Sequence, residues 1–263
     1  IIQVSNFHHR KGGAESLIIF GKAKDLIHYK NALSGLELFL LGVLFIISIY
    51  HMVLFLYRNN DKTFLIFSTL CVLISMRLLT TGEELMSEIF PNINWYISLK
   101  IEYLSFILAM PALLYYSYLF YKDEVSLIFV KIFFTIAIIF SLFVIVSPSE
   151  LFTYIPIAYQ WLIAIAAIYL LFVSIIAFIK KKENSLFYLG GYLLFFVIII
   201  NDILFFNKLL STSYLMPFGA FILAIVQSII LSKNVSLAFI RMEDLSKKLD
   251  SYNKELENKV KER

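Results

Sequence analysis

The chain has 263 residues, of which 60% are hydrophobic and only 16% are charged, and its mean hydropathy is +0.82. Soluble domains are about half apolar, with about a quarter of their residues charged. This composition therefore predicts an integral membrane protein whose first partner is the lipid bilayer. The net charge of +4 is spread over loops and a tail, so it gives no sign of a nucleic-acid partner.

Residues 1–27 differ from the rest of the chain because they lack a long apolar run. They contain two short β-like runs, Ile1–Val4 and Ser16–Phe20, on either side of the Gly12-Gly13 turn. A segment of this length cannot bury a core, so we expect it to be the last hairpin of a β-rich extracellular domain. The chain starts with Ile1 and stops in mid-pattern at Arg263, and we expect it to be a piece of a longer protein.

Residues 28–237 contain seven apolar runs of the kind that cross a bilayer. A helix needs about 20 apolar residues to span the hydrocarbon layer. The fold class that we predict is therefore an all-α membrane protein built around a seven-helix transmembrane bundle. The predicted spans are residues 33–57, 64–79, 96–120, 127–146, 157–179, 187–206 and 215–237.

The distribution of Lys and Arg between the loops predicts the orientation of the bundle. The connections after the first, third and fifth predicted spans carry the basic residues Arg58, Lys62, Lys122, Lys180, Lys181 and Lys182. The connections on the other side carry only Lys208. Lys and Arg accumulate on the cytoplasmic side of membrane proteins. We therefore predict an N-terminus outside the cell and a C-terminus in the cytoplasm.

Residues 238–263 form a charged tail with a regular apolar seam. The seam consists of Ala238, Met242, Leu245, Leu249, Tyr252 and Leu256, with alternating spacings of four and three residues. This is a heptad pattern, which predicts the start of a cytoplasmic coiled coil and a parallel homodimer. A solvated amphipathic helix without a partner is the alternative interpretation.

Five polar residues within the predicted spans are candidates for a polar pocket or signalling core, because a charged side chain is costly there. At about 1.5 Å per residue, Glu37, Arg77, Glu102, Asn201 and Asp202 all fall about 20–24 Å above the cytoplasmic side. A pocket that binds a ligand or transmits a signal is one explanation for this layer. A packing pair between Asp202 and Arg77 is another, and a third is that the helix ends are misplaced.

The chain lacks the motifs of common catalytic sites. It has no Gly-rich phosphate loop, no His-Glu-x-x-His and no Gly-x-Ser-x-Gly. His8 and His9 would point to opposite faces of a strand, which disfavours a metal site there. The only lysine of the last span, Lys233, lies near its end, which disfavours an opsin-like receptor. We therefore predict no catalytic residues, no metal and no cofactor.

Four segments outside the spans resemble the bacterial seven-transmembrane receptors with diverse intracellular signalling modules. VSNFHHRKGG at 4–13 and LIIFG at 17–21 resemble the close of the extracellular jelly-roll sensor domain of that family. LAFIRME at 237–243 resembles the exit from the last span, and NKELENKVKER at 253–263 is similar to the signalling helix that follows it.

This resemblance implies a sensor in the bacterial cytoplasmic (inner) membrane. Its extracellular domain would bind a small-molecule or carbohydrate ligand, and its tail would lead to a histidine kinase, as in a two-component system, or to a diguanylate cyclase. A transporter or channel that uses the buried charges is the main alternative. A membrane-embedded enzyme and a passive anchor between a sensor and an effector are two others.

Overall fold

The structure is a computed structural model that describes residues 19–83, 85–207, 209–210, 212 and 215–261. The described residues form nine helices and no strand. The helices are α1 (Ala23–Tyr57), α2 (Lys62–Thr80), α3 (Leu85–Ile89), α4 (Trp95–Phe120), α5 (Leu127–Val146), α6 (Ser149–Phe152), α7 (Ile155–Ile179), α8 (Ser185–Phe206) and α9 (Met216–Lys261).

Seven of these helices are long and apolar enough to cross a membrane, if α6 and α7 are taken together, which confirms the predicted number of spans. The bounds differ from the prediction at both ends of the bundle. Helix α1 starts at Ala23, well before the predicted start of the span, because a helix can continue in water beyond its apolar stretch. The short helices α3 and α6 were not predicted. The first predicted β-like run lies outside the described residues, and residues 19–22 have no regular secondary structure.

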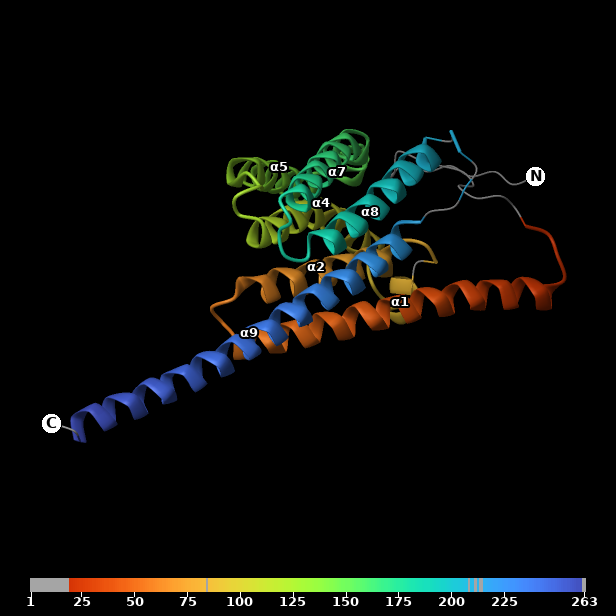
Figure 1. The fold of residues 1–263 in the computed structure, drawn as a ribbon. Helices are drawn as coiled ribbons and strands as arrows, with labels where there is room; N and C mark the ends of the chain where they lie inside the picture. Colours follow the sequence, from red (N-terminus) through yellow and green to blue (C-terminus); the bar gives the residue numbers. More distant parts are fainter. Residues whose placement is uncertain (1–18, 84, 208, 211, 213–214, 262–263) are drawn as a thin grey trace.

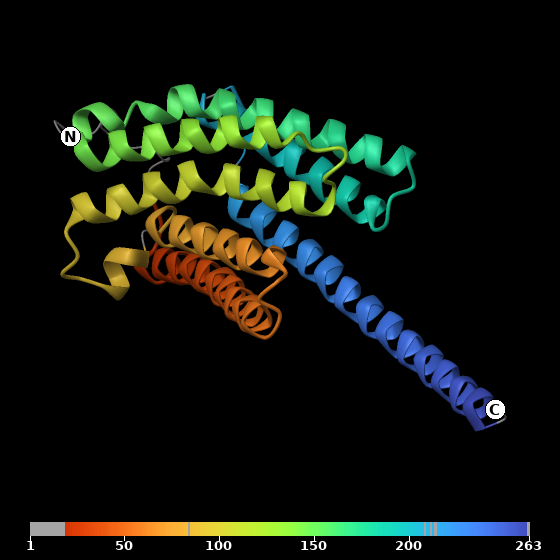
Figure 2. The ribbon, with the colours of Figure 1, turned by 90° about the vertical axis from the view of Figure 1, so that its left-hand side faces the viewer.

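The long helices form a ring in which α1, α2, α4, α7, α8 and α9 each contact the next, and α9 closes the ring against α1. Helix α5 packs on α4 at the edge of this ring. The connections that contain α3 and α6, and the connection between α8 and α9, lie at one end, which we call the α3 end. The other three connections lie at the opposite end, from which the last turns of α9 extend beyond every other helix (Figure 1, Figure 2). We call this the tail end.

Helices α2 and α4 start where a polar side chain binds one of their first free N–H groups. The side chain of Asp61 accepts from the Thr63 N–H at 3.1 Å at the start of α2, and that of Asn94 accepts from the Tyr96 N–H at 2.8 Å at the start of α4. Such N-caps satisfy N–H groups that have no partner inside the helix. They also mark the points at which the chain enters the apolar layer.

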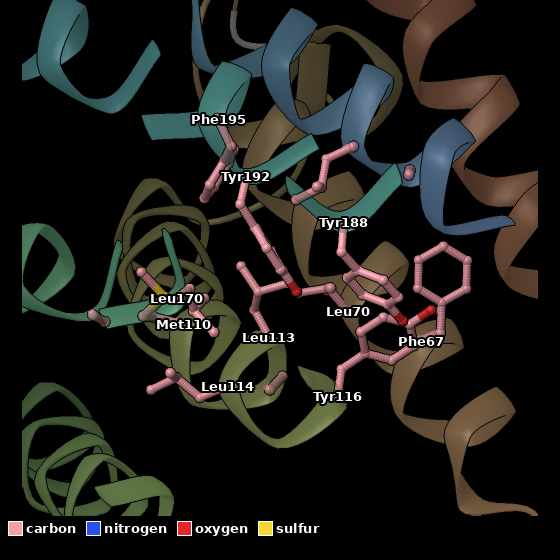
Figure 3. Packing of buried hydrophobic residues seen from close by; sticks show 14 of the residues in the cluster. Phe67, Leu70, Met110, Leu113, Leu114, Tyr116, Leu170, Tyr188, Tyr192 and Phe195 are labelled. Carbon is pink, nitrogen blue, oxygen red and sulfur yellow. The ribbon is translucent and has the colours of Figure 1, made fainter. Parts of the chain in front are cut away.

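The centre of the bundle is filled by large aromatic side chains from different helices (Figure 3). Tyr116 of α4 and Tyr188 of α8 are completely buried, and their hydroxyl groups point toward each other. The Ser117 Oγ and the Tyr192 hydroxyl, 2.6 Å apart, form a hydrogen bond between the same two helices. Inside a membrane, such packing and hydrogen bonds hold helices together, because lipid supplies no hydrophobic driving force between them.

The outward faces of the helices are apolar. On α5, for example, Ile128, Ile139 and Leu142 have 72%, 60% and 57% of their surface exposed. A soluble monomer rarely exposes such large continuous apolar areas. These faces fit the hydrocarbon layer of a bilayer, and the chain is a multi-pass membrane protein.

Candidate functional site

The five polar residues singled out in the spans lie at the α3 end, on α1, α2, α4 and α8. They form three separate groups there. One group joins Arg77 to Glu102, the second joins Asp202 and Asn201 to the start of α9, and the third joins Glu37 to the turn before α3.

Arg77 of α2 is bound to α4. Its Nη1 lies 3.2 Å from Oε1 of Glu102 and 3.3 Å from the backbone oxygen of the same residue. The guanidinium group also lies over the ring of Phe106, with its Cζ 4.7 Å from the ring centroid. An ion pair combined with a cation–π contact reduces the cost of a charge at this depth.

Asp202 of α8 caps helix α9. Its two carboxylate oxygens accept hydrogen bonds from the backbone N–H groups of Leu215 and Met216, both at 2.9 Å. The Asn201 side chain donates a third bond at 2.9 Å, and only 6% of the Asp202 surface is exposed. A helix N-terminus carries a partial positive charge and free N–H groups. This interaction is the reason that a carboxylate is tolerated inside the bundle.

A packing pair between Asp202 and Arg77 was one of the alternative explanations, and the structure gives each of them another partner. Each side chain has a different partner: Arg77 binds Glu102, and Asp202 binds the start of α9. The depth of each residue along its own helix places both in one layer, but depth carries no information on which helices are neighbours. Helix α8 packs against α7 and α9, whereas α2 packs against α1 and α4.

Glu37 of α1 is bound to the turn between α2 and α3. Its Oε2 accepts from the Glu83 N–H at 3.1 Å. Gly82 in the same turn has a φ of +70°, and a side chain at this position would collide with the Glu37 carboxylate. Nearer the start of α1, Nζ of Lys30 lies 2.9 Å from Oε1 of Glu88. Helix α1 is therefore attached at two points, to the α2–α3 turn through Glu37 and to α3 through Lys30.

Helix α9 presents one apolar stripe along its whole length. Inside the bundle the stripe contains Ala224, Gln227 and Leu231, each at most 3% exposed. Val235, four residues later, packs on the core only in part. Beyond the bundle the stripe continues in the seam Met242, Leu245, Leu249, Tyr252 and Leu256, whose side chains are 60–66% exposed. The surface that faces the bundle and the seam of the tail thus lie on the same side of a single helix.

The α7–α8 connection contacts α9 where this helix leaves the bundle. The Asn184 side chain donates to Oδ1 of Asn234 at 2.7 Å, and Asn184 has a φ of +59°, in the left-handed region. About two turns farther along α9, Nη2 of Arg241 lies 3.8 Å from Oε2 of Glu183. These two contacts hold one side of α9 at the tail end, and we call them the α9 clamp.

The base of the clamp is fixed to the α4–α5 connection. The Tyr121 hydroxyl donates to the Glu183 backbone oxygen at 3.1 Å. Nζ of Lys182 lies 3.1 Å from Asp123 and 3.4 Å from Glu124. Hydrogen bonds to these two carboxylates raise the pKa of Lys182 above its ordinary value, so Lys182 is charged at neutral pH. The carboxylate side chain of Glu124 is only 1% exposed and also binds Lys180 at 3.3 Å.

Three functional candidates in the structure were missed in the sequence: Gln227, Asn184 and Asn234. Gln227 lies within the last predicted span, and a carboxamide in an apolar run was a signal of the same kind as Asp202. Asn184 and Asn234 lie at span ends, where polar residues are expected, so the sequence gave no reason to single them out. Among the described residues, no group of three or more His, Cys, Asp or Glu side chains could hold a metal ion.

The ring of membrane-crossing helices and the continuous helix α9 define a multi-pass transmembrane region. A family model described as 7TM diverse intracellular signalling matches residues 34–234. The chain belongs to this family, as its resemblance predicted, and it is a transmembrane signalling receptor region. Searches of curated proteins and of solved structures each found no match.

The cap on α9 predicts a graded effect of substitutions at Asp202. Asp202→Ala removes both acceptors of the α9 N-terminus and should lower the free energy of unfolding by about 2 kcal/mol. Asp202→Asn keeps one oxygen acceptor and should cost about half as much. Denaturant unfolding in detergent measures both values, and hydrogen exchange at the Met216 amide should accelerate in the alanine variant.

Asn207→Ala is the matched control, because the exposed Asn207 side chain donates to the Ile203 backbone oxygen of its own helix at 2.7 Å. The cap has no energetic role if Asp202→Ala costs no more than this control.

Proposed function

We propose that this chain passes an extracellular signal through its seven-helix bundle to a cytoplasmic effector by moving helix α9. The single observation that carries the proposal is the continuity of α9, which runs as one 46-residue helix from the α8–α9 connection through the bundle and far beyond it. A stiff helix that starts inside the bundle and ends outside it transmits a rotation or a shift along its axis.

The apolar stripe of α9 supports this mechanism. Because the stripe inside the bundle and the seam of the tail share one side of the helix, any rotation within the bundle turns the seam by the same angle. Pairs of opposite charge at positions i and i+4, Glu243–Lys247, Asp244–Lys248 and Glu255–Lys259, stabilise the tail as a helix. The tail therefore keeps the angle that the bundle gives it.

The tail seam is the proposed contact with a second copy of the chain. Met242, Leu245, Leu249, Tyr252 and Leu256 form an exposed heptad seam flanked by charges, which is typical of a parallel coiled coil. A parallel homodimer would place two effector domains side by side. The resemblance to the family favours a histidine kinase or a diguanylate cyclase as that effector.

The proposed orientation places the α3 end outside and the tail end in the cytoplasm of a bacterial inner membrane. The tail end carries Arg58, Lys62, Lys122 and Lys180–Lys182, which supports this orientation. The signal would then enter at the α3 end, where α1 starts. A sensor domain before α1, of which the residues up to Lys22 would be the last part, would act on α1. Helix α1 is bound to the α2–α3 turn by Glu37 and to α3 by Lys30.

The buried charges give no support to a transporter. Arg77, Glu102, Asp202 and Glu37 each bind another part of the protein. Their contacts join neighbouring helices at the α3 end, which is the place where a receptor bundle must respond to its input.

Disulfide crosslinking of the tail tests the proposed dimer. With Cys71 replaced by Ser, single cysteines at Leu245, Leu249, Tyr252 and Leu256 should crosslink strongly in native membranes, because equivalent seam residues face each other in a parallel coiled coil. Cysteines at Lys248 and Glu255 are the off-seam controls and should crosslink weakly. Equal crosslinking at all six positions would exclude a specific parallel seam.

Replacement of the bundle tests the receptor function. In the full-length protein, residues 34–234 are exchanged for an unrelated single-span anchor that leaves the tail and effector intact. Because the proposal assigns control of the effector to the bundle, effector activity in membranes should change severalfold and should no longer respond to substitutions in the extracellular domain. Unchanged effector activity and an unchanged response would mean that the bundle is a passive anchor.

A further inference from the structure

We infer that α9 has a second position in the bundle, in which the carboxamide of Gln227 binds the hydroxyl of Tyr188, and that the α9 clamp holds the position seen here. This inference rests on the proposed function, because it assigns a switch to the helix that carries the signal. It concerns residues that neither the family match nor the motifs of the sequence single out.

Gln227 is the first observation. It lies on the apolar stripe of α9, its side chain is completely buried, and neither Nε2 nor Oε1 has a hydrogen-bond partner among the described residues. A buried amide without partners is costly, and such groups are rare in stable structures. Leucine or methionine would fill this position without that cost. A carboxamide here fits a helix that needs a hydrogen bond in another position.

The register of α8 and α9 shows which partner is within reach. The two helices run antiparallel: Asn184 binds Asn234, Gly191 lies close to Leu223 and Val226, and Asp202 binds Leu215 and Met216. Gln227 therefore lies at the level of Gly190 and Gly191, within one turn of Tyr188 and Tyr192. Gly191 contributes no side chain at this level, so the Leu223 and Val226 side chains of α9 lie directly against its backbone.

Tyr188 is the partner that this register offers. It is completely buried, and its hydroxyl, which faces the Tyr116 hydroxyl, has no hydrogen bond of normal geometry to another described residue. The Tyr192 hydroxyl, in contrast, is already bound to Ser117 at 2.6 Å. Tyr188 points into the core toward Tyr116 of α4 (Figure 3). A phenol can both donate to the carboxamide oxygen and accept from its nitrogen, so the pair can form after a modest turn of α9.

The α9 clamp is the interaction that opposes this turn. Asn184 and Asn234 form a 2.7 Å hydrogen bond at the edge of the bundle, and Glu183 and Arg241 add a longer ion pair in a more exposed place. A rotation of α9 that brings Gln227 toward Tyr188 moves Asn234, seven residues later on nearly the same side, away from Asn184. The two hydrogen bonds are thus alternatives, and each belongs to one position of the helix.

Spin-label distances in the full-length protein test this switch. With Cys71 replaced by Ser, labels at Lys122 and Ser246 report the position of the tail relative to the α4–α5 connection, and dilution with unlabelled protein removes distances between copies. We expect two distances in the parent protein. Gln227→Met and Tyr188→Phe should each change the ratio of the populations at the two distances at least about threefold, in favour of the distance given by this structure. Each substitution removes the hydrogen bond of the second position.

Asn184→Ala and Asn234→Ala should shift the ratio in the opposite direction by a similar factor, since they remove the clamp. Ser232→Ala, on the exposed side of α9, is the control and should change nothing. The inference is overturned by a single distance in all variants, by an unchanged ratio in Gln227→Met or Tyr188→Phe, or by a shift of these two in the same direction as Asn184→Ala.

Effector activity of the same variants separates the inference from the proposed function. If the distance populations shift as expected and effector activity changes with them, both the inference and the proposed function are supported. If the distances shift and effector activity is constant, α9 has two positions but does not carry the signal. Tyr188→Phe keeps the aromatic ring in place, so it gives an answer even where a larger change would prevent folding.

Discussion

The hydrogen bonds from the Leu215 and Met216 N–H groups to the Asp202 carboxylate fix the point at which α9 starts. Within a bilayer no water is present to bind the free N–H groups of a helix start, so the protein must supply the acceptors itself. Asp202 does so from α8, and it thereby joins the last two membrane helices at the α3 end. This attachment sets where α9 begins relative to α8.

The same helix is held at its other end by a weaker interaction. The side chains of Asn184 and Asn234 are only partly buried at the tail end, and a hydrogen bond there competes with water. A helix with one strong and one weak attachment can pivot about the strong one. Gln227 lies between the two attachments, and its buried carboxamide would form the hydrogen bond that stabilises the second position of α9.

The number and type of the membrane helices could be predicted from the sequence because hydropathy over about 20 residues is a property of the chain alone. The heptad seam of the tail could also be predicted, because the spacing of its apolar residues is likewise a property of the chain alone. The partners of Asp202 and Arg77 could not be found in this way, because depth along a helix is local information whereas neighbourhood in the ring depends on the whole bundle. Gln227 carried a visible signal, a polar residue in an apolar span, but its complete burial without a partner is a property of the packed structure.

The central claim is that α9 transmits an angle from the bundle to the effector, and insertions in α9 test it most directly. One to seven alanines are inserted after Leu237 in the full-length protein, and effector activity is measured for each variant. Each residue turns the tail by about 100°, and seven residues nearly restore the original angle. The account predicts that effector activity rises and falls with the number of residues and returns to the parent level at seven. Activity that is the same for every insertion would contradict it.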